Sequence, residues 1–371
     1  MIQKNYKPEI KIALNESMPM YYLVAFMVFS IAFLSTISAI GRVSSNLLQS
    51  GQAIVVLITY AIFCFYKNKI RVQSLILIVL NTALLIVNLA PYMVSLSMLV
   101  MLYDIGSCCS NDELKKLLKV FFLTSLVLFI SVSTLYFIFN FNNHDVIMWR
   151  IDKLIYRKSL GFIHPNITSI IWVSIFFSCI GVMQKKHTRI KMAWLIVVSG
   201  IILGETQSRT SLYMILIVGG AIFVLGNKTY IVVKRRVGLI SLMVPATLIC
   251  GSIIILFSPI DPTLNNILSG RIALYQSFYA EFGIHFFKTK ELESAMFDNG
   301  YLQALLAKGI LFFIEQLIVF FYIFYSRNSF NLKQLLLIIG FFSIGFTETA
   351  LQHFELVVPV LFTVLLDPEN I

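Results

Sequence analysis

The sequence has few charged residues and few cysteines. Only 13% of its 371 residues are charged, against about a quarter in a typical soluble domain. The five cysteines form no C-x-x-C pair of the kind that holds zinc. P-loop, G-x-G-x-x-G, H-E-x-x-H and G-x-S-x-G motifs are also missing from the sequence. These absences argue against a soluble enzyme, and neither a cofactor nor a metal ion is expected.

Long apolar runs take the place of the missing charge. Hydrophobic residues make up 58% of the chain, and they gather in runs of roughly twenty, the length that crosses a hydrocarbon core of about 30 Å. Because backbone groups in lipid need internal hydrogen bonds, these runs are expected to be helices. The sequence therefore predicts an all-α, polytopic integral membrane protein, with residues 1–371 forming one transmembrane domain of about twelve helices. The predicted spans lie near residues 20–40, 47–66, 72–87, 90–103, 120–140, 166–183, 192–205, 210–226, 237–257, 301–325, 334–346 and 353–366.

The basic residues indicate how these spans are oriented. The net charge is +11 at pH 7, and most Lys and Arg residues fall in alternate loops that are interior when both termini are inside. Residues 1–19 lack the pattern of a cleavable signal peptide, so the first apolar run is expected to remain as a span. No soluble segment combines a basic run with base-stacking aromatics, so nucleic acid is not an expected partner. The prediction is a multi-pass protein with both termini in the cytoplasm.

Two exterior loops are longer than the others, at 141–164 and 258–299, and long ordered loops often carry function. The first loop is net positive on the side of the membrane where positive charge is disfavoured. Its residues Arg150 and Arg157 could bind an anion such as the phosphate of a lipid carrier, which guanidinium groups grip with two hydrogen bonds. Attraction to anionic lipid headgroups is the alternative explanation.

The first long loop ends in the sequence GFIHPN, directly before an apolar run. Proline is favoured at the first position of a helix, so Pro165 is expected to begin the next span. His164 would then lie at the positive end of a helix dipole, which favours a neutral imidazole that can act as a general base. A capping histidine at the membrane interface is the alternative. Asn166 belongs to the same motif.

A later exterior turn, ETQSRTS, places Arg209 between two apolar runs, with Ser208 and Thr210 available to cap the following helix. Ionisable residues at the ends of spans are costly to bury and tend to be functional. The alternative for Arg209 is a side chain that extends to the membrane interface.

The second long loop contains the sequence RIALYQSFYAEFGIHFF, which has the pattern of an amphipathic helix suited to a bilayer surface. Arg271 begins this helix, and Glu281 and His285 flank its apolar face. The loop ends at Asp298 and Asn299, directly before another span. Packing accounts for the aromatic residues as well as ligand binding does, but it accounts less well for Arg271 and Asp298. The aromatic face consists of Tyr275, Phe278, Phe282 and Phe286.

The order of these motifs resembles that of the O-antigen ligase and polymerase superfamily. His-Pro-Asn opens one span, Ser-Arg-Thr follows at a later exterior turn, Ser-Gly-Arg lies in the large late loop, and Asp-Asn-Gly-Tyr-Leu opens the next span. More narrowly, the chain is similar to Wzy-type polymerases of capsule, O-antigen or exopolysaccharide repeat units. The motifs cover about 160–310, and the predicted topology covers the whole chain.

The resemblance implies an enzyme on the outer face of the bacterial cytoplasmic membrane. It would move a growing chain from one undecaprenyl-pyrophosphate carrier onto the non-reducing end of a new carrier-linked oligosaccharide repeat unit. Arginines would steady the leaving pyrophosphate, and His164, Asp298 or Glu348 would act on the acceptor hydroxyl. Membrane lipid, a chain-length regulator and a flippase of the same pathway are the implied partners. The implied catalytic residues are His164, Arg209, Arg271 and Asp298, and the implied substrate-binding residues are Arg150, Arg157, Asn166, His285, Asn299 and Glu348.

Two alternatives stay open. A ligase that transfers polymer to a final acceptor would use similar residues, and it would typically have a histidine late in the large loop. His285 and His353 are the candidates for that histidine. A flippase or transporter of lipid-linked oligosaccharide would be expected to have mid-span ionisable residues and repeat symmetry. Here the polar residues gather on one face, which favours an outward-facing enzyme.

Overall fold

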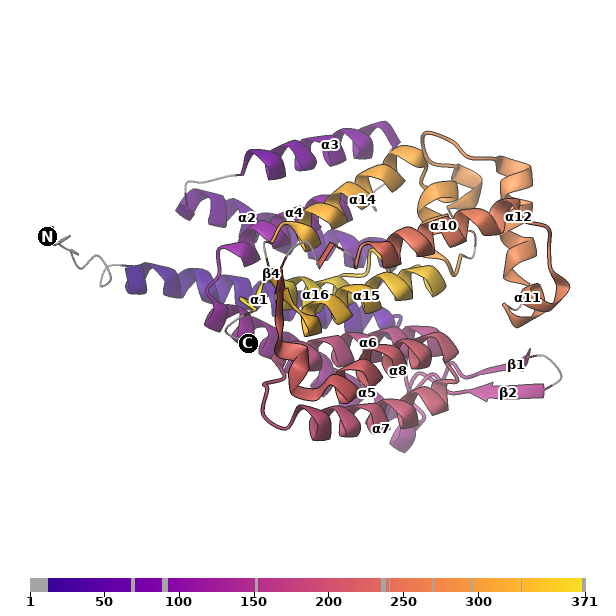
Figure 1. Cartoon of the computed structure of the whole chain (residues 1–371), viewed down its shortest axis with the longest axis horizontal. Coiled ribbons are helices and arrows are strands. Elements are labelled where there is room, and N and C mark those ends of the chain that lie inside the picture. The colour runs from indigo at the N-terminus through magenta and orange to yellow at the C-terminus, as the bar shows by residue number, and fades with distance from the viewer. Residues whose placement is uncertain are drawn as a thin grey trace, which may run out of the picture.

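The computed structural model describes residues 13–67, 71–88, 93–150, 153–234, 238–239, 241–268, 270–293, 295, 297–327 and 329–368. Over these residues the chain forms a bundle of helices whose axes run along the length of the molecule (Figure 1). The bundle helices are α1 (Ala13–Ala39), α2 (Ser45–Lys67), α3 (Val72–Asn88), α4 (Val94–Ser107), α5 (Asn111–Phe139), α6 (Pro165–Val182), α7 (Thr188–Thr206), α8 (Arg209–Leu225), α10 (Met243–Phe257), α14 (Ile310–Tyr325), α15 (Leu332–Thr347) and α16 (Phe354–Leu365).

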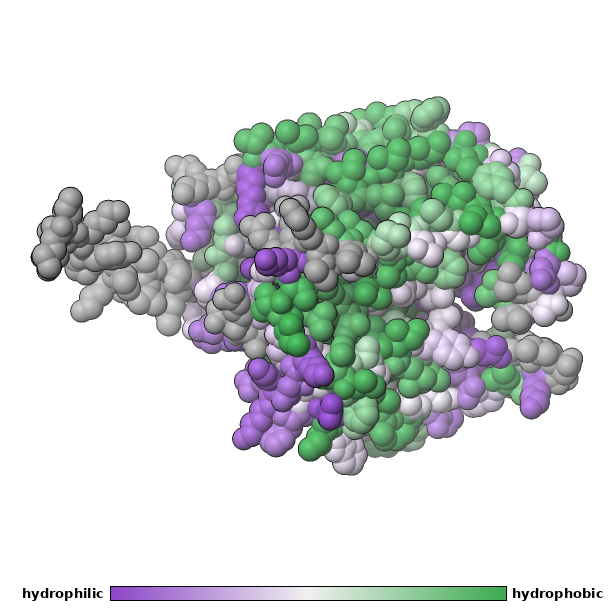
Figure 2. All heavy atoms as spheres, viewed as in Figure 1, coloured by the Kyte–Doolittle hydropathy of each residue, from purple (hydrophilic) through white to green (hydrophobic). Residues whose placement is uncertain are grey.

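A predominantly helical protein is therefore confirmed, and several helices suit a membrane. Within the described residues, five helices are long and apolar enough to cross one: Met20–Ala39, Leu47–Lys67, Asn111–Phe139, Pro165–Val182 and Arg209–Tyr230. Others are apolar but shorter, including α3, α4, α10, α14, α15 and α16. Figure 2 shows a broad apolar surface over the middle of the bundle, with hydrophilic residues gathered toward its two ends.

The helices differ in how much of their surface the protein covers. In α6, 78% of an apolar stretch of 18 residues is buried inside the protein, whereas in α5 the buried share of such a stretch is 28%. α6 packs against α16 and α5, and α16 also packs against α15. The core thus lies around α6 and α16, and α5 turns much of its surface outward, which is typical of a helix that borders lipid.

Local sequence signals begin several of these helices. Ser110 caps α5 through a capping box with Glu113, and Asn331 caps α15 in the same way with Gln334. Pro165 occupies the first position of α6, as predicted from the His-Pro-Asn motif. These caps satisfy backbone N–H groups that no helical carbonyl can reach.

The first long loop contains a feature that the all-α prediction missed. Strands β1 (Val146–Arg150) and β2 (Lys153–Arg157) form an antiparallel hairpin that extends from one end of the bundle (Figure 1). The segment is rich in Val, Ile, Trp and Tyr, which favour strands. A second short pairing joins β3 (Val232–Lys234) to β4 (Ser329–Asn331).

The second long loop contains α11 (Pro262–Ile267), α12 (Arg271–Phe282) and the 3₁₀ turn η3 (Lys290–Leu292). The predicted helix is confirmed and begins at Arg271, but it ends at Gly283, whose φ of +67° suits glycine. His285 and Phe286 therefore lie beyond the helix, and Phe286 is 66% exposed. The rest of the predicted aromatic face packs inside the protein, where buried Tyr275 stacks on Phe297.

After this loop the chain enters α13 (Gly300–Leu302), the π-helical turn η4 (Gln303–Ala307) and then α14. The helix predicted at 301–325 is thus interrupted near its start. The 3₁₀ turn η2 (Gly226–Tyr230) directly follows the end of α8.

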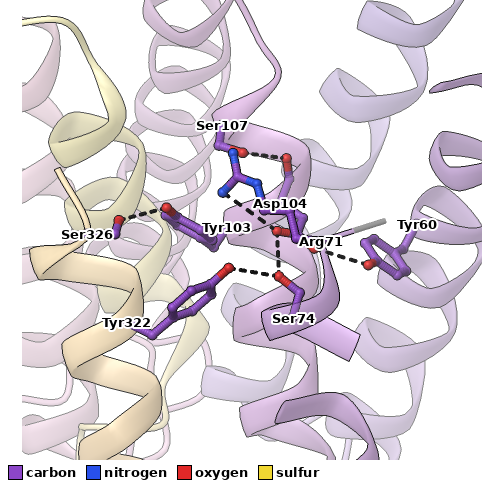
Figure 3. Close-up of polar contacts among 8 residues, drawn as sticks. All are labelled: Tyr60, Arg71, Ser74, Tyr103, Asp104, Ser107, Tyr322 and Ser326. Carbon is purple, nitrogen blue, oxygen red and sulfur yellow. Dashed lines mark hydrogen bonds and ion pairs between the residues drawn. The ribbon is translucent and has the colours of Figure 1, made fainter. Parts of the chain in front are cut away.

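A polar cluster joins α2, α3, α4 and α14 (Figure 3). The buried carboxylate of Asp104 in α4 accepts hydrogen bonds from Tyr60 of α2 at 3.1 Å and from Ser74 of α3 at 2.8 Å. Arg71 lies 3.9 Å from the same carboxylate, and the Ser74 hydroxyl contacts the Tyr322 hydroxyl of α14 at 3.0 Å. A buried carboxylate is costly unless it is paired and hydrogen-bonded, and these contacts meet that requirement.

Candidate functional site

An ion pair joins the start of α12 to the end of the second long loop. Arg271 at the start of α12 places its Nε 2.7 Å from Oδ2 of Asp298. One turn along α12, the hydroxyl of Tyr275 accepts the backbone N–H of Asp298 at 3.1 Å. Both charged side chains remain partly exposed, at 35% for Arg271 and 18% for Asp298. The pair predicted to be catalytic is therefore built into a defined structure that solvent or a ligand can reach.

Asn299 fixes the backbone next to Asp298. Its Oδ1 accepts the N–H groups of Tyr301 and Leu302 at 2.9 Å, and its Nδ2 donates to Ser252 of α10 at 2.9 Å. Buried Asn299 is thus the N-cap of α13. These bonds hold the start of α13 and, with it, the position of Asp298.

Glu348 ends α15 beside this pair. The side chain is buried and its Oε1 accepts a hydrogen bond from the Thr210 hydroxyl of α8 at 3.1 Å. Burial and, to a smaller extent, Asp298 raise the pKa of Glu348, and with the opposing effects of Thr210, Arg271 and Arg157 the pKa is about 7. The carboxyl of Glu348 therefore lies within electrostatic range of all three charged residues.

Arg157 comes from the hairpin and reaches the start of α6. Arg157 is only 4% exposed, although attraction to anionic lipid headgroups was one explanation for the positive charge of its loop. Its Nε donates to the carbonyl of Thr206 at 3.0 Å, and its Nη2 donates to Oδ1 of Asn166 at 2.5 Å. The neighbouring Lys158 instead pairs with Glu205 at 2.6 Å. The burial of Arg157 and these two hydrogen bonds do not fit a side chain that only attracts lipid headgroups at the surface.

His164 is the N-cap of α6, and its ring has a defined orientation. Its Nδ1 accepts the backbone N–H of Asn166 at 3.1 Å. Burial lowers the pKa of His164, Arg157 lowers it further, and Asp298 opposes these effects. A neutral imidazole whose Nδ1 accepts a hydrogen bond carries its proton on Nε2. In this tautomer His164 presents an N–H donor, which suits an anion better than it suits the predicted role as a base.

The other predicted residues lie at the edge of this cluster or outside it. Arg209 is exposed at the start of α8, next to Thr210, and the expected capping bond from Ser208 does not form. His285 is exposed beyond α12, where its Nε2 contacts the carbonyl of Phe282 at 2.5 Å. The side chain of Arg150 lies outside the described part of the structure.

A second histidine lies close to the site, and the sequence analysis had considered it only as a candidate for the late histidine of a ligase. His353, the N-cap of α16, places Nδ1 2.8 Å from Oε1 of Glu355. Ser35 donates to the other carboxylate oxygen at 3.1 Å, and Gln52 donates to Ser35 at 2.9 Å. Burial lowers the pKa of His353, but Glu355 outweighs burial and raises it above its ordinary value, with a smaller contribution from Glu348. The signal that could have found this pair is His-x-Glu at the start of a span.

The site as a whole brings hydrogen-bond donors that could bind an anion close to carboxyl groups that could transfer a proton. Arg157 and Arg271 supply two guanidinium groups, His164 supplies an imidazole N–H, and Asp298 and Glu348 supply the carboxyls. Among the described residues, no group of three or more His, Cys, Asp or Glu side chains is placed to hold a metal ion.

Comparison with protein-family models, with curated proteins and with solved structures finds no match to this chain. The case for a function therefore rests on the motif order in the sequence and on the geometry of this cluster.

Proposed function

We propose that this chain is a polymerase of undecaprenyl-pyrophosphate-linked oligosaccharide repeat units for a capsular, O-antigen or exopolysaccharide product. It is a glycosyltransferase-type enzyme with about twelve membrane spans and cytoplasmic termini, and it acts on the outer face of the bacterial cytoplasmic membrane. One observation supports the proposal above the others. Residues from the hairpin, α6, α12, α13 and α15 converge at the end of the bundle away from both termini (Figure 1).

The reaction requires that a sugar–phosphate bond break as a new glycosidic bond forms. The acceptor hydroxyl attacks the anomeric carbon of the donor chain, and undecaprenyl pyrophosphate leaves with the bonding electron pair. Arg271 and Arg157 stabilise the charge that develops on the pyrophosphate, since guanidinium groups bind two phosphate oxygens at once. The Nε2–H of His164 adds a donor aimed at the same charge.

A carboxyl takes the proton of the acceptor hydroxyl. In Asp298, Oδ2 is held by Arg271 while the side chain stays partly exposed, so this carboxylate can face an acceptor. Glu348 has a pKa of about 7, which is close to the value that serves a general base at neutral pH. In this scheme the proton moves to a carboxyl, while the imidazole of His164 serves the leaving group.

Reconstitution tests the proposal directly. The purified protein in lipid vesicles should convert a carrier-linked repeat unit into a ladder of longer chains and release undecaprenyl pyrophosphate. Asp298→Asn should stop elongation, whereas Arg189→Ala, at an exposed contact with Val224, should leave it unchanged. Transport of repeat units across the vesicle without elongation would identify a flippase instead. Transfer of finished polymer to a final acceptor, without elongation, would identify a ligase.

A further inference from the structure

The β1–β2 hairpin has one face that is apolar and exposed. Its register sets Ile147 opposite Tyr156 and Trp149 opposite Leu154. Directly opposite residues, and residues two apart on one strand, share a face of a hairpin, so these four side chains lie together. Their exposures are 63% for Ile147, 71% for Trp149, 59% for Leu154 and 52% for Tyr156. Such a cluster on a projecting hairpin is unusual for a surface that only meets water.

The hairpin is anchored at its base to the last turn of α5. Tyr156 and Tyr136 both donate hydrogen bonds to Oδ2 of Asp145, the bond from Tyr136 measuring 2.7 Å. The other oxygen of Asp145 accepts the backbone N–H of Ser159 at 2.7 Å. These bonds lower the pKa of Asp145, although burial opposes them, so the carboxylate anchor stays charged near neutral pH.

Exposed apolar side chains also lie at the end of α5, to which Asp145 ties the hairpin. There the consecutive side chains of residues 137–139 are exposed by 62% for Phe137, 64% for Ile138 and 72% for Phe139. A groove of about 510 Å³ follows this turn and is bordered by Lys158. Because α5 is long and apolar enough to span a membrane, the hairpin is tied to the end of a helix whose exposed apolar side chains suit lipid.

The residue types are those of a membrane interface. Trp and Tyr collect at the headgroup level because their rings are amphipathic, and lysines near the surface are attracted to anionic lipids. The hairpin has Trp149 and Tyr156 on its exposed face and exposed Lys153 at its turn. We infer that the hairpin lies in the lipid–water interface, with Ile147, Trp149, Leu154 and Tyr156 among the headgroups and upper acyl chains of membrane lipid.

The placement of the hairpin also sets the depth of Arg157 in the site, and this second step rests on the proposed function. Arg157 follows Tyr156 directly, and its buried guanidinium joins the site at Asn166. A hairpin held at headgroup depth therefore holds this guanidinium near the level of lipid phosphates, where the pyrophosphate of a lipid-linked substrate would lie. The placement of the hairpin itself requires only that the chain spans a membrane.

Tryptophan fluorescence measures the depth of the hairpin. The chain has three tryptophans, Trp149, Trp172 and Trp194. In vesicles of brominated phosphatidylcholine, Trp149 alone (Trp172→Phe with Trp194→Phe) should lose about half or more of its emission when bromine lies near the headgroups, since interfacial side chains lie about 5–10 Å deep. Bromine near the acyl-chain ends should quench it less, and aqueous iodide should quench it weakly. Strong iodide quenching without bromine quenching would overturn the inference.

Two comparisons keep the test sound. Trp149→Phe combined with Trp194→Phe should remove the component that shallow bromine quenches, because exposed Trp194 is also gone, and this variant leaves buried Trp172 and its bond to Ser199 intact. The native component that remains from Trp172 should be shielded from iodide, because Trp172 is only 4% exposed. Neither readout needs enzymatic activity, so failure of the lipid placement and failure of the polymerase proposal are separate results.

Discussion

At the scale of single residues, substitution can separate the cap that His164 provides from its proposed role as a donor to the leaving group. Its Nδ1 caps α6, and its Nε2 is left to donate. Asn is among the best N-cap residues, so His164→Asn should keep the cap while it removes the Nε2 donor. We expect normal thermal stability and a loss of about 10²–10³ in polymerisation rate, the usual effect of one donor to developing charge.

The cap itself provides the control for that experiment. His164→Ala removes both functions and should also lower stability by about 1 kcal/mol, as expected for a lost N-cap. Wild-type chain lengths from His164→Asn would leave capping as the only role of the histidine.

Arg271 tests whether the arginines act through geometry or through charge alone. Lysine carries the same charge but cannot present two parallel N–H groups to phosphate or to Asp298. Arg271→Lys should therefore lose about 10²–10³ in rate, nearly as much as Arg271→Ala. Arg209→Lys applies the same test to the exposed arginine at the start of α8. Full-length polymer from a lysine variant, resolved on a gel at normal protein levels, would assign that arginine to interface attraction.

The raised pKa of Glu348 predicts how stability depends on pH. A carboxyl whose folded pKa lies above its unfolded value favours the folded state below about pH 4.5, and this contribution disappears as pH rises through about 7. Thermal stability in detergent should therefore fall between pH 5 and pH 8, by on the order of 2 kcal/mol from this group. Glu348→Gln should flatten that fall.

Thr210 supplies a second way to test the same group. Its hydroxyl favours the ionised form of Glu348, so Thr210→Val should raise the pKa and move the fall in stability to higher pH. An unchanged pH profile in both variants would show that Glu348 does not titrate in this range.

At the scale of elements, the long apolar runs were enough to predict the bundle helices. The structure of the loops was harder to predict, because their charge and their pattern of apolar residues suggested different structures. Apolar length located the bundle helices, and Pro165 fixed the start of α6. The hairpin was missed because the loop was interpreted through its net charge, although β1 and β2 contain β-branched and aromatic residues that favour strands. The amphipathic helix was found, but its aromatic face packs against Phe297, since sequence alone cannot distinguish lipid from protein as the apolar partner.

Gly300 tests how closely two elements of the site have to approach. A Cβ at this position would lie 3.1 Å from the backbone oxygens of both Glu348 and Gly345, which are at the end of α15 and cannot move aside as a side chain can. Gly300→Ala should cost about 1–3 kcal/mol of stability and also reduce polymerisation, because it separates Asp298 from Glu348. The measurements are thermal unfolding in detergent and chain length on a gel.

Gly220 in α8 is the matched control. No atom lies within 4 Å of a Cβ built there, so Gly220→Ala should be neutral or stabilising by up to about 1 kcal/mol. Equal effects from the two alanines would mean that the contact of α13 with α15 does not constrain the site.

At the scale of the whole molecule, the charge pattern could predict which loops share a face but not which residues meet. Thr210 and Glu348 are far apart in sequence, and their hydrogen bond depends on α8 packing against α15. Helix packing in a membrane depends on side-chain fit between neighbours, which a list of spans does not contain. For the same reason the pairing of His353 with Glu355 was not predicted, because the link from Glu355 to Ser35 joins segments that are far apart in the sequence.

The orientation of the molecule is the broadest prediction, and every site assignment depends on it. The site lies at the end of the bundle away from both termini, so cytoplasmic termini place it outside (Figure 1). A cysteine at position 290, from Lys290→Cys in the late loop, should react with a membrane-impermeant thiol reagent in intact cells, because Lys290 is exposed. A cysteine at position 187, from His187→Cys, should react only after permeabilisation, as should the exposed native Cys108. The excess of Lys and Arg near position 187 is the physical reason, since basic loops are retained in the cytoplasm. Strong labelling of position 187 in intact cells, with none at 290, would place the cluster of Arg157, Arg271 and Asp298 inside the cell. A reaction between lipid-linked sugars on the outer leaflet would then lose its structural basis.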